Sequence, residues 1–158
     1  MNQTMSFLKK MFVLVLFVGL SACGGAKEDA LKAEIDETMQ VISDQLTSLN
    51  AVKMEQESVA DGLEEDLKWE YSPEFEEAVK SYVSTVEHLN ESIAELDVIY
   101  DELAGINEKI EKGAPLEYSS QLMTEMAEER IERFEEVVAD IEATQDKLYD
   151  LSDQIDQM

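Results

Sequence analysis

The sequence predicts an all-α protein whose body is an elongated, coiled-coil-like bundle of three helices running up, down and up. Two observations lead to this fold class. Apolar residues recur in alternating steps of three and four along three long segments, which is typical of helices that pack side by side. The connections between these segments are short, and short connections make neighbouring helices antiparallel.

The first 22 residues have the layout of a secretory signal peptide. Lys9 and Lys10 give a positive start, residues 11–20 form a run of apolar residues with one glycine, and the small residues Ser21 and Ala22 follow. The run is too short to span a bilayer, which takes roughly 20 apolar residues. A retained anchor helix or a buried core helix is the alternative, but the abrupt change to an acidic chain favours a cleaved signal.

The residues Leu20-Ser21-Ala22-Cys23 resemble the lipobox of bacterial lipoproteins. The resemblance implies that the Cys23 thiol receives a diacylglycerol, that the signal is cleaved before it, and that acyl chains such as palmitate anchor the protein. Cys23 is the only cysteine, so it has no partner for an internal disulfide. Residues 23–27 are then a lipidated cysteine and a short tether. We expect the body on the extracytoplasmic face of the cell membrane, or at the outer membrane in a Gram-negative host.

The body after Cys23 is strongly acidic. The chain has 12 basic and 37 acidic residues, and without Lys9 and Lys10 the body carries a formal charge of 10 minus 37, or −27. Such a surface repels nucleic-acid phosphates, which excludes nucleic-acid binding and predicts a cationic partner. Five pairs at i,i+4 spacing add a little helix stability: Glu28–Lys32, Glu64–Lys68, Glu76–Lys80, Glu108–Lys112 and Glu129–Arg133.

The first predicted helix covers residues 28–68. Gln56 interrupts its apolar stripe, and Gly62 costs about 1 kcal/mol relative to alanine, so a bend near Gly62 is compatible with the pattern. The stripe consists of Leu31, Ile35, Met39, Ile42, Leu46, Leu49, Ala60, Leu63 and Leu67.

The second predicted helix covers residues 73–112 and has the clearest boundaries. Ser72 can cap it and Pro73 suits its first position, while Gly113 and Pro115 end it. Its stripe, which Asn107 interrupts, consists of Phe75, Val79, Tyr82, Val86, Leu89, Ile93, Leu96, Tyr100, Leu103 and Ile110.

The third predicted helix covers residues 119–157, and its stripe is interrupted by polar residues. Folding the helices on their turns puts Gln56, Thr85 and Thr144 in one layer. It also puts Arg130 near Tyr100 and Asp101. We expect these polar groups to fix the alignment of the helices, the alternative being that each turns to solvent. The apolar members of the third stripe are Met123, Ala127, Phe134, Val137, Ile141, Leu148, Leu151, Ile155 and Met158.

No pattern in the sequence forms a reaction centre. His88 is the only histidine, and an isolated histidine cannot build a metal site or a catalytic triad by itself. The carboxylate clusters at 64–66, 74–77 and 132–136 are typical of solvated helix faces, and glycine-rich phosphate loops and calcium loops are absent. The sequence therefore predicts no enzyme, no catalytic residue, no metal ligand and no cofactor.

Three aromatic residues, Trp69, Tyr71 and Phe75, gather at the first predicted turn. Aromatic side chains are enriched in protein interfaces, which makes this turn a candidate partner-binding tip. The alternative is that the aromatic side chains close the open end of the bundle core. With Cys23 in the membrane, this turn lies at the end of the bundle farthest from the bilayer.

A lipobox followed by three long helices is similar to the architecture of the YkyA-like lipoproteins, a family associated with cell-wall binding. The resemblance covers the whole chain and brings no catalytic residues with it. It implies a membrane-anchored lipoprotein that acts as a non-catalytic interaction or spacer module in the cell envelope, with a protein or envelope component as partner. The alternative is an acidic inhibitor or immunity-type lipoprotein that binds a basic protein.

Overall fold

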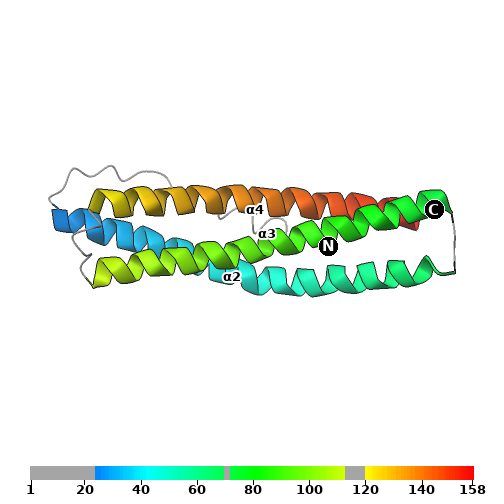
Figure 1. Cartoon of the computed structure of the whole chain (residues 1–158), viewed down its shortest axis with the longest axis horizontal. Helices are drawn as coiled ribbons and strands as arrows, with labels where there is room; N and C mark the ends of the chain where they lie inside the picture. Colours follow the sequence, from blue (N-terminus) through cyan, green and yellow to red (C-terminus); the bar gives the residue numbers. More distant parts are fainter. Residues whose placement is uncertain (1–23, 70–71, 113–119) are drawn as a thin grey trace.

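The computed structural model describes residues 24–69, 72–112 and 120–158, and within these ranges it is a bundle of three helices (Figure 1). The helices are α2 (Gly24–Asp66), α3 (Pro73–Glu111) and α4 (Ser120–Asp156), with 43, 39 and 37 residues. They run up, down and up, which confirms the predicted fold class. At 1.5 Å per residue each helix is about 60 Å long.

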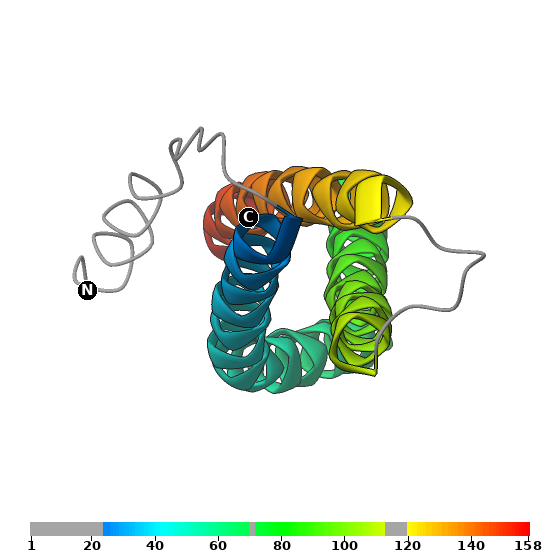
Figure 2. The ribbon, with the colours of Figure 1, turned by 90° about the vertical axis from the view of Figure 1, so that its left-hand side faces the viewer.

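The middle helix α3 holds the bundle together. It packs along both α2 and α4, whereas α2 and α4 contact each other much less. In the view along the bundle, each helix sweeps sideways along its length, so the helices cross at an angle (Figure 2). Because α3 has a neighbour on each flank, it buries a wider face than either of the other helices.

The boundaries of α3 follow the predicted signals. Ser72 has an extended backbone and its Oγ accepts a hydrogen bond from the amide of Phe75 at 3.0 Å, while Pro73 occupies the first helical position. At the other end the amide of Lys112 donates to the carbonyl of Glu108 at 3.1 Å. The predicted stop at Gly113 lies outside the described residues.

The first helix is longer at its start than predicted. The structure has Gly24–Lys27 as part of α2, although these residues were expected to form a short tether. The sequence offers no proline between Gly24 and Leu31 that would separate a tether from the helix. α2 also continues through Gly62 without interruption.

The core follows the predicted stripes with corrections to the second and the third stripe. On α3, Ile99 and Ile106 are buried at 2% exposure each, whereas Tyr100, which the predicted stripe contained, is only half-buried. In the third stripe, Met158, which lies just after α4, is 66% exposed, and Val138 on α4, which the predicted stripe lacked, is buried at 3% exposure. The largest fully buried side chains are Ile35, Ile42, Leu89, Leu96, Leu103 and Val79.

The two ends of the bundle differ in what they contain. The end of α2, the start of α3 and the end of α4 lie together at one end, which we call the tip (Figure 1). Gly24, Glu111 and Ser120 lie at the opposite end, which we call the base. Trp69 therefore lies a full helix length away from Gly24.

Candidate functional site

The first candidate site is the tip, where α2 ends in a tight turn. The amides of Lys68 and Trp69 donate to the carbonyls of Glu65 and Asp66 at 3.1 and 2.9 Å. This turn leaves the Trp69 side chain 87% exposed, so Trp69 does not close the bundle core. Phe75 is half-buried, and Tyr71, the third aromatic of the predicted tip, lies outside the described residues.

Apolar side chains from all three helices are incompletely covered at the tip. Leu63, Leu151 and Ile155 pack against the core but remain half-buried. At the base, Leu31 and Met123 are 8% and 3% exposed, but Ile110 is half-buried and Leu122 is 38% exposed. Apolar side chains are therefore incompletely covered at both ends, and Trp69 at the tip is the most exposed large apolar side chain in the described part of the chain.

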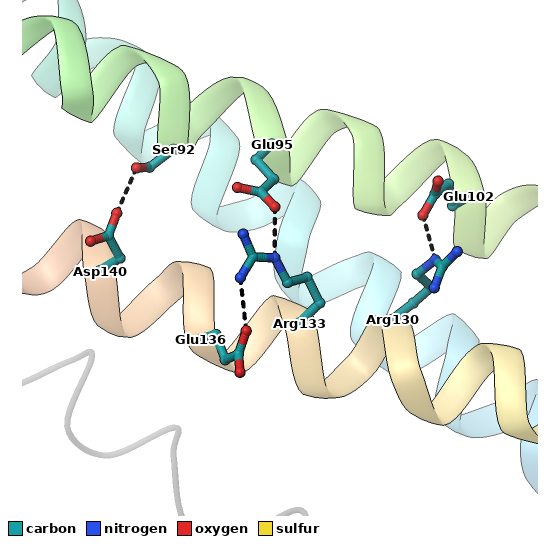
Figure 3. A network of polar contacts seen from close by, with 7 residues as sticks. All are labelled: Ser92, Glu95, Glu102, Arg130, Arg133, Glu136 and Asp140. Atoms are coloured by element: carbon teal, nitrogen blue, oxygen red, sulfur yellow. Dashed lines mark hydrogen bonds and ion pairs between the residues drawn. The ribbon is translucent and has the colours of Figure 1, made fainter.

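The second candidate site is a row of polar contacts between α3 and α4, drawn in Figure 3. It includes both arginines of the sequence, Arg130 and Arg133. Arg133 Nε donates to Glu95 Oε1 at 2.7 Å and its Nη1 to Glu136 Oε2 at 2.8 Å. The hydrogen bond to Glu95, and to a smaller extent the one to Glu136, raises the pKa of Arg133, so its guanidinium stays charged.

Arg130 makes a similar pair one turn away. Its Nε lies 2.5 Å from Glu102 Oε2 on α3, and its Nη1 lies 2.9 Å from Glu129 Oε2 on its own helix. The predicted height of Arg130 along α3 is confirmed to within two residues, but its partner is Glu102 and not Tyr100 or Asp101. Of the predicted i,i+4 pairs, Glu76–Lys80 and Glu108–Lys112 are present as ion pairs, while Glu28 of a third pair has a side chain outside the described part of the structure.

The same row contains Asp140, which two residues of α3 contact. Ser92 Oγ donates to Asp140 Oδ2 at 2.7 Å, and His88 Nε2 lies 3.1 Å from the same oxygen. The hydrogen bond from Ser92, more than the contact with His88, holds the pKa of Asp140 below its ordinary value of 3.8, although partial burial opposes this shift.

Serine, histidine and aspartate meet here in an order that does not activate the serine. In a catalytic triad the histidine lies between the other two and takes the proton of the serine. Here Asp140 lies between Ser92 and His88, and the Ser92 side chain is buried at 5% exposure. The geometry favours a contact that joins α3 to α4 over a nucleophilic centre.

Two shallow hollows flank His88 on this face, with volumes of about 500 and 350 Å³. Their linings are almost entirely polar, and Thr85 and Thr144 line the larger one together, as the predicted layer requires. Among the described residues, no group of three or more His, Cys, Asp and Glu side chains is arranged to hold a metal ion.

Contacts between α2 and α3 complete the alignment of the helices. The Tyr82 hydroxyl donates to Gln56 Oε1, which puts Gln56 within one turn of Thr85. Asn90 donates to Glu57 at 2.8 Å, and Asn107 donates to Asp36 at 2.6 Å. Polar contacts therefore fix α3 against both neighbours.

The predicted lipidation site, Cys23, lies outside the described residues. None of the helices within the described ranges combines the length and the apolar character that crossing a bilayer takes. Comparisons of the chain with protein-family models, with curated proteins and with solved structures found no match.

Proposed function

We propose that the protein is a membrane-anchored lipoprotein that acts as a non-catalytic spacer and interaction module in a bacterial cell envelope. The lipobox-like residues Leu20-Ser21-Ala22-Cys23 support the anchor. Two or more acyl chains on Cys23 hold a protein stably on a bilayer without a spanning helix.

The observation that carries the proposal is the arrangement of the two ends. α2 begins directly after Cys23, and Trp69 lies exposed at the opposite end of the bundle. An anchor at Cys23 then presents Trp69 about 60 Å from the bilayer, the length of a helix of this size. A bundle of this length reaches partners that a protein lying on the membrane surface cannot contact.

The anchor is tested with Cys23→Ser in cells. The unchanged protein is expected in the membrane fraction and is expected to incorporate an alkyne-labelled palmitate analogue. Cys23→Ser is expected to lose the label and to leave the membrane while keeping the helical circular-dichroism spectrum. A Cys23→Ser protein that stays in the membrane fraction would contradict the lipid anchor.

The interaction part is tested by crosslinking in intact cells. A photo-reactive amino acid at Trp69 is expected to trap a partner, whereas the same amino acid at Val98 serves as the control. Val98 is 55% exposed but lies away from the tip, in the middle of α3. A single stoichiometric basic protein favours the inhibitor or immunity-type class, and wall fragments favour the cell-wall class. Equal products from both positions would contradict a binding tip.

A further inference from the structure

The tip carries Trp69, the most exposed large apolar side chain of the described residues, and half-buried apolar residues lie at the same end. Five of the seven large exposed apolar side chains among the described residues belong to the half of the bundle that contains the tip: Met54, Val59, Trp69, Tyr149 and Met158. Leu67 and Phe75 are half-buried there as well. Exposed aromatic residues such as Trp69 are enriched where proteins bind one another.

The surroundings of these apolar side chains are acidic. The two lysines near the turn already have carboxylate partners, since Lys68 lies 3.7 Å from Glu65 and Lys80 lies 2.5 Å from Glu76. Other exposed carboxylates at the tip come from all three helices: Glu64, Asp66, Glu74, Glu77, Asp153 and Asp156.

Charge decides what can cover such a surface. A second copy of the chain would bring its own acidic tip against this one, and like charges across an interface oppose association. A segment with lysines and arginines around an apolar stripe matches the tip in both respects. Its apolar side chains would cover the half-buried apolar residues of the tip, and one of its cations could stack on the exposed indole of Trp69.

We propose that the tip binds a cationic amphipathic segment of a partner protein, whose apolar face covers Leu63, Leu67, Trp69, Phe75, Leu151, Ile155 and Met158. This inference deepens the proposed function by naming the chemistry of the partner. It does not depend on the lipid anchor, because the tip is formed by the three helices alone.

The test uses the only tryptophan of the chain as its reporter. The full chain in a nonionic detergent is titrated with a tryptophan-free helical peptide of leucine and lysine, with leucines at i, i+3, i+4 and i+7. Binding at the tip is expected to shift the Trp69 emission to the blue and to weaken as salt is added. A peptide with glutamate in place of lysine is expected not to bind.

Variants locate the binding. With a fluorophore-labelled peptide, Trp69→Ala is expected to weaken binding at least about tenfold, which is typical of an anchoring aromatic residue, whereas Val98→Ala leaves it unchanged. Asp66→Lys with Asp153→Lys is compared with Glu34→Lys and Glu37→Lys on the base half of α2. Both pairs change the net charge equally, but only the pair at the tip is expected to weaken binding.

Three results would overturn the inference: equal affinity for both peptides, equal loss with both charge-reversed pairs, or a dimer in sedimentation equilibrium that Trp69→Ala abolishes. The last result would assign the tip to a second copy. If the peptide does not bind but membrane attachment still depends on Cys23, the cationic partner is rejected and the proposal of an anchored spacer remains. Loss of membrane attachment with the peptide still bound would do the reverse.

Discussion

Arg133 Nε on α4 lies 2.7 Å from Glu95 Oε1 on α3, and the same guanidinium also reaches Glu136. Arg133 is therefore a cation between two carboxylates in a chain whose body carries an excess of 27 negative charges. This contact joins α3 to α4. An acidic side chain in place of Arg133 would be repelled by both Glu95 and Glu136.

We expect Arg133→Glu to lower the melting temperature more than Arg133→Ala does, because it adds repulsion as well as removing the pair. Added salt should narrow the difference, since salt screens exposed charges. Thermal circular dichroism at low and high salt measures both effects. Lys68→Glu is the control, because it makes the same charge change in a local pair between the turn after α2 and Glu65. An equal drop in both charge-reversal variants would contradict the role of Arg133 between helices.

Removing one partner of the hydrogen bond from Tyr82 to Gln56 should leave the other polar group unpaired and partly buried, which costs stability. Burial raises the pKa of Tyr82, so its hydroxyl stays protonated and donates. Tyr82→Phe and Gln56→Leu are each expected to destabilise the bundle by about 1 kcal/mol, and the double variant by less than their sum. Urea unfolding of the four proteins gives this cycle. Unchanged stability and oligomeric state in Gln56→Leu would show that Gln56 does not fix the alignment.

The contact between Ser92 and Asp140 predicts a dependence on pH. The folded pKa of Asp140 lies below its ordinary value, so its stabilising contribution is present above about pH 4 and is lost as the pH falls through the folded pKa. Ser92→Ala removes the main cause of this shift. It should therefore cost more stability at pH 7 than at pH 3.

Carboxyl NMR titration checks the same point directly. The pKa of Asp140 is expected to rise in Ser92→Ala and to stay in place in Ser84→Ala, which changes an exposed serine of the same helix. An unchanged pKa of Asp140 in Ser92→Ala would show that the hydrogen bond does not hold the carboxylate in its charged form.

The three helices could be predicted from the sequence because their apolar residues keep one spacing for many turns. It missed a third buried row on α3 that recurs every seven residues: Ala78, Thr85, Ser92, Ile99 and Ile106. Two of its five members are hydroxyl residues and one is alanine, so hydropathy does not mark it. The row is buried because α3 has a neighbour on both flanks, which becomes visible only once the three helices are packed.

The polar contacts of α3 with α4 could not be predicted from the sequence for a similar reason. Asp140 is one of 37 acidic residues, and nothing in its neighbours along the chain distinguishes it. Its role follows from the angle at which α4 meets α3, which brings Ser92 and His88 to it. Arg130 could be placed to within two residues because its height depends on helix lengths alone.

The third row makes a direct prediction about two adjacent residues. Ile99→Ala should destabilise the bundle by about 2–5 kcal/mol, the usual cost of emptying a buried isoleucine site. Tyr100→Ala should cost less, because Tyr100 is only half-buried. Urea unfolding of the two variants compares them. A larger loss in Tyr100→Ala would mean that α3 is rotated by one residue relative to the bundle described here.

Gly62 offers the opposite kind of variant, one that should stabilise. A Cβ at Gly62 meets no atom within 4 Å, and the same holds for Gly105 on α3. Gly62→Ala and Gly105→Ala should therefore each add about 0.5–1 kcal/mol, because alanine loses less backbone freedom than glycine when a helix forms. Urea unfolding measures the gain. If Gly105→Ala stabilises the bundle and Gly62→Ala does not, α2 must bend at Gly62. The affinity of Gly62→Ala for the leucine-lysine peptide would then show whether that bend serves binding at the tip.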